Sequence, residues 1–133
     1  MTGTATIVPV LPVSPGQGLS IVRIAAMFVS AGVLHVVRPR LFLAIVPPWL
    51  PAPRALVFLS GAAEVVGGLG MLLPEVRSWA AWGLAALLVA VVPANLYMWL
   101  AADRFRAVPR WALAARLPLQ AVWIAWVLWA GLS

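Results

Sequence analysis

Four long apolar runs restrict what this chain can fold into. They cover residues 19–37, 55–73, 78–100 and 111–132, and each has about the 20 residues that a helix needs to cross a bilayer. Backbone polar groups in lipid must find partners within their own segment, so each run is expected to be a helix. The sequence predicts an all-α integral membrane four-helix bundle over residues 19–133. Residues 1–18, rich in Thr, Pro and Gly and without charge, are expected to form a flexible tail.

The composition supports the membrane class and narrows the partners. The chain is 65% hydrophobic and 9% charged, whereas about a quarter of an ordinary soluble domain is charged. It contains no cysteine, which excludes disulfides and thiolate metal sites. All nine basic residues are arginines, and all but Arg23 and Arg116 lie between the apolar runs. Because they form no single basic patch, the expected partner is the lipid bilayer and not nucleic acid.

The connections between the runs predict an orientation. Residues 38–54 contain five prolines around an apolar centre, which is too short to span and too apolar for an exposed loop. A proline-rich interfacial loop is therefore expected between the first two spans. Six arginines lie in the first and third connections, namely Arg38, Arg40, Arg54, Arg104, Arg106 and Arg110, against Arg23 and Arg77 on the other side. The positive-inside rule then predicts cytoplasmic first and third loops and external termini, in a bacterial plasma membrane.

Polar residues from all four runs fall at similar depth in the cytoplasmic half. They are His35, Glu64, Asn95, Arg116 and Gln120. Ionisable groups that face lipid are unfavourable, so these side chains are expected to point inward. Arg116 is expected to pair with Glu64, because an isolated buried charge is strongly destabilising. Pro93 and Pro118 are expected to bend their helices near Asn95 and Gln120.

This constellation predicts a polar pocket for a small lipophilic molecule, of which a quinone is one example. Arg116, Gln120 and Asn95 would donate hydrogen bonds to a carbonyl, and Glu64 would hold Arg116 or exchange a proton. His35, Trp49 and Tyr97 complete the candidate ligand-binding set, with Trp49 at the mouth of the pocket. In this interpretation the protein is an accessory or ligand-binding subunit. No metal is expected, because one His, one Glu and an Asn make a poor ligand set.

Two alternatives remain open from the sequence. Glu64 and His35 would act as acid and base in an isomerase-like membrane enzyme if both opened into one pocket. Otherwise the chain would have a purely structural role, for example as a homodimer through the small-residue stripe of Gly61 and Gly68.

Three stretches together resemble the small DoxX-type membrane proteins. They are "AGVLHVVRPRLFLAIVPPWLP", "SGAAEVVGGLGMLLP" and "PANLYMWL", and the resemblance extends over roughly residues 25 to 100. The matching motif residues are His35, Pro48, Glu64, Pro93 and Asn95. The resemblance implies a four-helix membrane bundle. Since DoxX-type proteins include a membrane subunit of a thiosulfate:quinone oxidoreductase, it also implies a redox-enzyme partner. It assigns no catalytic residue.

Overall fold

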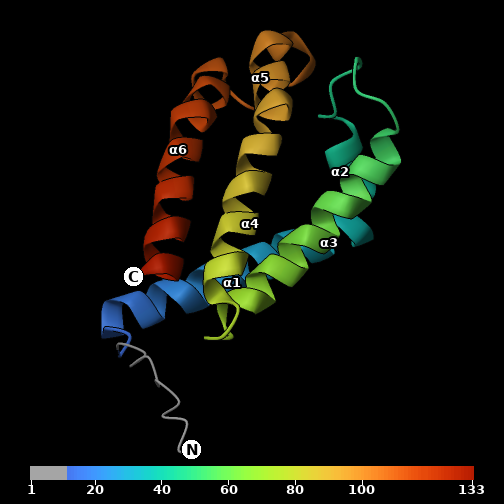
Figure 1. Ribbon diagram of the computed structural model, residues 1–133. Helices are drawn as coiled ribbons and strands as arrows, with labels where there is room; N and C mark the ends of the chain where they lie inside the picture. The colour runs from blue at the N-terminus through green and yellow to red at the C-terminus, as the bar shows by residue number, and fades with distance from the viewer. Residues whose placement is uncertain (1–11) are drawn as a thin grey trace, which may run out of the picture.

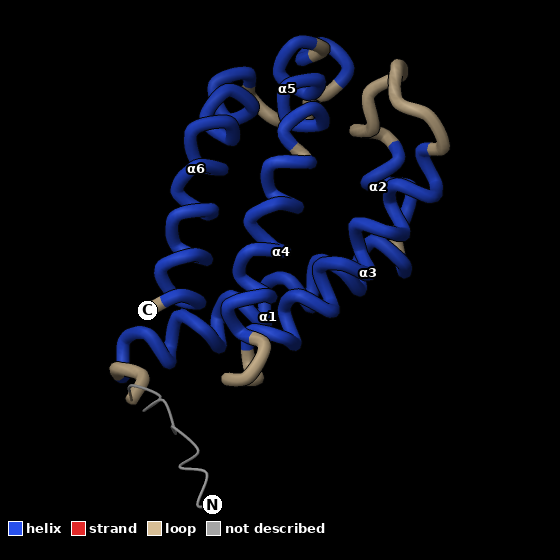
Figure 2. The backbone as a smooth tube through the Cα atoms, in the orientation of Figure 1, coloured by secondary structure: helices blue, strands red, loops and turns tan. Residues whose placement is uncertain are grey.

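The computed structural model describes residues 12–133, and the regular secondary structure of this part of the chain is all helical, with turns and loops between the helices (Figures 1 and 2). The helices are α1 (Pro15–Val37), α2 (Pro39–Leu43), α3 (Pro53–Met71), α4 (Arg77–Ala90), α5 (Val92–Leu100), the 3-10 helix η1 (Ala102–Arg104) and α6 (Arg110–Leu132). Helices α1, α3 and α6, together with α4 and α5 taken as one interrupted segment, are long and apolar enough to cross a membrane. The predicted all-helical membrane architecture is confirmed at this level.

Helix α1 begins earlier than the sequence predicts. Ser14 caps it by accepting a hydrogen bond from the Gln17 backbone N–H at 3.2 Å, and Pro15 occupies the first turn, where no N–H is needed. Residues 15–18 are therefore helical, and their assignment to a flexible tail is wrong. Residues 1–11 of that predicted tail lie outside the described residues.

Gln17 joins the first helix to the last. Its side chain is buried and donates hydrogen bonds to the carbonyl oxygens of Ala130, at 3.0 Å, and Ser133, at 2.9 Å. The last carbonyls of a helix have no intrahelical partner, so Gln17 caps the end of α6 from another helix.

The chain runs up and down between two ends of the bundle. The long connections 38–52 and 101–109 lie at one end, here called the loop end (Figure 1). The two ends of the described chain and the short turn 72–76 lie at the other, here called the terminal end. The four long helices form two pairs, α1 with α3 and α4–α5 with α6.

Small residues bring α1 and α3 into close contact. A Cβ atom added to Gly32 would lie 2.5 Å from the carbonyl oxygen of Gly61, and one added to Gly68 would lie 3.1 Å from the carbonyl oxygen of Ala25. The predicted stripe of small residues is therefore real but is covered by α1 of the same chain. In this chain α1 occupies the surface of the stripe, and the homodimer stays a prediction.

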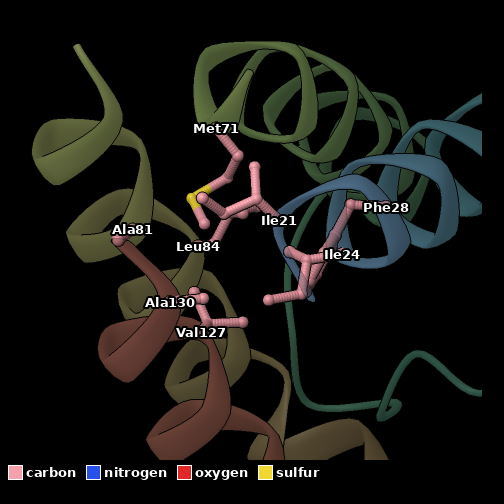
Figure 3. Close-up of a cluster of buried hydrophobic side chains, with 8 residues drawn as sticks. All are labelled: Ile21, Ile24, Phe28, Met71, Ala81, Leu84, Val127 and Ala130. Carbon is pink, nitrogen blue, oxygen red and sulfur yellow. The ribbon is translucent and has the colours of Figure 1, made fainter. Parts of the chain in front are cut away.

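The two helix pairs meet through a core at the terminal end. Its buried side chains come from α1, α3, α4 and α6 and converge on one another (Figure 3). They are Ile21, Ile24, Phe28, Met71, Ala81, Leu84, Val127 and Ala130. Gly67 faces Leu84, and Gly131 faces Ala81, so small residues again set the helix spacing.

The third span is interrupted at Val91. Helix α4 ends at Ala90 and α5 begins at Val92, and the backbone N–H groups of Ala94 and Asn95 both donate to the Val91 carbonyl, at 3.1 and 3.2 Å. Pro93 has no N–H to continue the α4 ladder, which explains the predicted irregularity here. Helix α6, in contrast, continues through Pro118.

The segment that follows α2 crosses from one helix pair to the other. Ile45 packs against a second buried cluster at the loop end, formed by Met98, Ala102 and Leu113. Residues 44–50, here called the crossing segment, thereby connect α2 to α5 and α6. This segment is a run of turns and not an extended loop.

Candidate functional site

A cavity of about 490 Å³ separates the two helix pairs at the loop end. Its walls come from α1 and α3 on one side and from α4, α5 and α6 on the other. Phe28 of the core in Figure 3 also lines the cavity, as do Met27 and Leu88, which pack against that core. Pro47 and Leu50 of the crossing segment line it as well. The volume lies within the range of small-molecule sites, about 300–1,000 Å³.

The buried His35 and the half-buried Glu64 lie side by side in the wall of this cavity. His35 Nδ1 lies 3.2 Å from Glu64 Oε2, and both residues line the cavity. They meet because Gly61, one helical turn before Glu64, allows α1 to approach; a Cβ there would lie 2.6 Å from the His35 Cβ. The imidazole also stacks on Phe42 of α2, with the ring centroids 3.5 Å apart. The two candidate catalytic residues therefore open into one pocket.

The imidazole of His35 donates its Nδ1 proton to a backbone carbonyl. Nδ1 lies 2.7 Å from the carbonyl oxygen of Ala31, a distance that requires a proton on this nitrogen. Glu64 Oε2 is shielded from solvent and receives no hydrogen bond from the described residues, although the imidazole is its neighbour. The carboxyl group of Glu64 therefore lacks a full set of donors.

Arg116 does not pair with Glu64. It lines the cavity from α6 but is exposed, and its guanidinium is not within ion-pair distance of the carboxylate. Helix α6 packs mainly against α4, α5 and α1, and so lies diagonally across the bundle from α3. The predicted Glu64–Arg116 pair is wrong, and His35 occupies the position next to the acid.

Asn95 and Gln120 bond to each other across the opposite wall. Asn95 Nδ2 donates to Gln120 Oε1 at 2.8 Å, and Gln120 Nε2 donates to the carbonyl oxygen of Leu88. Leu88 lies in the last turn of α4, close to the interruption at Val91, so the amide pair fastens α6 to the broken span. Both residues line the cavity as predicted, but each already donates to the protein.

Trp49 and Tyr97 lie outside the cavity lining. Their rings pack edge to face with centroids 5.9 Å apart, and Tyr97 makes a similar contact with Phe105 at 6.0 Å. The Tyr97 hydroxyl accepts a hydrogen bond from Arg104 at 3.0 Å. These two aromatic residues join the crossing segment to α5 and η1, and their contact with a ligand stays a prediction.

Sequence reasoning missed one residue of the site, Ser60, which lines the cavity one turn from Glu64. Away from the site it also missed Gln17, a buried polar residue at the terminal end. The signal for the His35–Glu64 contact was present in the facing small residues Gly32 and Gly61, which mark where α1 and α3 touch.

Comparison with protein families identifies where this fold belongs. Residues 24–131, which include every residue of the cavity wall, match a family described as a domain of unknown function, DUF8561. The chain belongs to the DUF8561 family. Neither the curated proteins nor the solved structures contain a match to it. The DoxX resemblance therefore stays a prediction.

This DUF8561 chain presents an apolar chamber with a few polar groups on its walls. Within residues 12–133 no three His, Cys, Asp or Glu side chains lie close enough together to hold a metal ion. The chemistry open to the cavity is the binding of a lipophile through hydrogen bonds, or proton transfer by the His35–Glu64 pair.

Proposed function

We propose that this protein binds a small lipophilic molecule in the cavity at the loop end, with its polar group beside His35 and Glu64. The observation that carries the proposal is a carboxyl group, with its side chain only 14% exposed, in the wall of an otherwise largely apolar chamber. Pockets of this kind bind the ligand body through apolar side chains and orient it through a few polar groups. Ionisable residues within membrane spans are also most often functional.

An accessory role beside a redox enzyme, with a quinone-type molecule as ligand, is part of the same proposal. It is supported by the DoxX-like motif residues, of which His35, Glu64 and Asn95 line one cavity.

Filling the cavity is expected to abolish ligand retention. Ala94 lines the cavity, whereas Ala86 is exposed on α4 and does not. Ala94→Leu should reduce the amount of copurified lipophile about tenfold or more relative to wild type, because it removes the space for the ligand. Ala86→Leu, the matched control, should retain the wild-type amount. The measurement is mass spectrometry of molecules extracted from the purified protein, and equal retention in all three proteins would contradict the proposal.

The second candidate is an enzyme that moves a proton on the bound lipophile, and the 3.2 Å approach of His35 to Glu64 favours it. The same mass spectrometry separates the two. A wild-type protein incubated in heavy water should incorporate deuterium into the bound lipophile at carbon if it is an enzyme, and Glu64→Gln should not. A binding subunit leaves the carbon skeleton unlabelled in both proteins.

We further propose that the loop end faces the cytoplasm, with the crossing segment at the membrane interface. The support is the excess of arginine in residues 38–54 and 104–110. Because the chain has no cysteine, single substitutions can report the orientation. Asp103→Cys should be protected from an impermeant thiol reagent in intact cells, and Glu75→Cys should be labelled. The reverse pattern would overturn the orientation.

A further inference from the structure

The nitrogen donors of His35, Asn95 and Gln120 in the cavity wall already form hydrogen bonds within the protein. His35 Nδ1 donates to the Ala31 carbonyl at 2.7 Å. Asn95 Nδ2 donates to Gln120 at 2.8 Å, and Gln120 Nε2 donates to the Leu88 carbonyl. Each of these three nitrogens therefore has one protein partner, and each amide NH₂ keeps a second N–H.

The Glu64 carboxyl, in contrast, is an acceptor without an adequate donor. Its Oε2 atom is shielded from solvent and has no hydrogen bond from the described residues, while Oε1 is not shielded in this way. Arg116 makes no ion pair with it. A buried carboxyl that lacks donors is unfavourable by a margin that a ligand can recover on binding.

We propose that the cavity selects lipophiles whose polar head is a hydroxyl group over the same molecules bearing a carbonyl. The hydroxyl donates a hydrogen bond to Glu64 on the side facing the cavity, and the hydrocarbon body lies against Phe28, Leu88 and Leu119. An ionised carboxyl only accepts hydrogen bonds, so it can bond a hydroxyl but not a ketone, which has no proton to donate. For a quinone, the same rule selects the reduced hydroquinone. This inference rests on the proposed ligand-binding function and specifies its ligand class.

The rule reverses the expectation from sequence that Arg116, Gln120 and Asn95 donate to a carbonyl. Arg116 is the remaining cation of the cavity lining and is exposed at its edge. A ligand held there through a carbonyl would depend on Arg116 and not on Glu64. The two binding modes therefore predict different sensitive residues.

The test compares 4-heptylcyclohexanol with 4-heptylcyclohexanone, which share a skeleton and differ in the head group. The full chain in phosphatidylcholine nanodiscs is titrated with each compound, and binding is followed by the shift in thermal unfolding temperature. The alcohol should bind about tenfold more tightly than the ketone, the size expected for one hydrogen bond to a buried group. In Glu64→Gln the preference should fall below about threefold, because an amide can present either its oxygen or its NH₂ group.

Glu75→Gln is the matched control, since Glu75 is exposed in the turn at the terminal end, and it should keep the full preference. Three results would overturn the inference without contradicting ligand binding. The wild type could bind the alcohol and the ketone equally, or it could prefer the ketone and lose that preference in Arg116→Gln. The preference for the alcohol could also persist in Glu64→Gln. Absence of a saturable shift with both compounds would overturn the proposed function as well. If Glu64→Gln does not fold, the relative affinity of the wild type for the alcohol and the ketone tests the inference by itself.

Discussion

Replacing Gly32 by leucine is expected to lower the free energy of unfolding by about 3 kcal/mol or more. A Cβ atom at this position would lie 2.5 Å from the Gly61 carbonyl oxygen, 2.7 Å from the Val65 side chain and 3.0 Å from the Val65 backbone nitrogen. Two of these three atoms are backbone, so rotamer changes cannot make room. Helices α1 and α3 would have to separate, and the His35–Glu64 contact would be lost with them.

Gly83→Leu provides the control, because a Cβ on Gly83 meets nothing within 4 Å. Leucine also favours a helix over glycine by about 1 kcal/mol, so this variant should unfold at or above the wild-type temperature. Both variants are measured by thermal unfolding in the same nanodiscs. A Gly32→Leu protein as stable as Gly83→Leu would show that α1 and α3 do not pack as described.

His35→Phe is expected to destabilise the protein by about 3 kcal/mol, because it leaves the carboxyl of Glu64 without its polar neighbour. The side chains of His35 and Glu64 are 10% and 14% exposed, so solvent offers little compensation. Phenylalanine keeps an aromatic ring for Phe42 to stack on, which isolates the loss of the imidazole nitrogens.

The double variant His35→Phe/Glu64→Leu separates this effect from general damage to the core. Removing both polar partners leaves no unpaired group, so the double variant should be more stable than the sum of the single changes predicts, by about 1 kcal/mol or more. If the change in the free energy of unfolding of the double variant equals the sum of the changes in the two single variants, the two residues do not interact.

Much of the fold was predictable because its signals are local. The length of the apolar runs set the spans, and Pro93 predicted a bend in the third span, which the structure shows as an interruption at Val91. The start of α1 was missed, since the Ser14 cap and Pro15 lie in a stretch whose composition resembles a tail. The long-range capping of α6 by Gln17 carries no local signal at all.

The sequence predicted how deep the site residues lie in the bundle but not which of them are in contact. Counting residues along each helix placed His35, Glu64, Asn95 and Gln120 in the same half of the bundle, and all four line the cavity. Spacing along one helix does not say which other helix lies beside it. Helix α1, not α6, packs along α3, so Glu64 meets the imidazole and not the guanidinium. A long arginine side chain also reaches polar surroundings more easily than a histidine does.

The uneven joining of the two helix pairs has a mechanical consequence. At the terminal end the pairs share the core of Figure 3 and the Gln17 hydrogen bonds, whereas at the loop end the contacts of the crossing segment span the space between them. Local opening follows the regions with the fewest buried contacts. The two helix pairs should therefore move as rigid bodies about a hinge beside Gln17, which opens or closes the cavity around Glu64. Ligands of different width would then enter through small rotations of whole helix pairs, and no single helix would have to unfold.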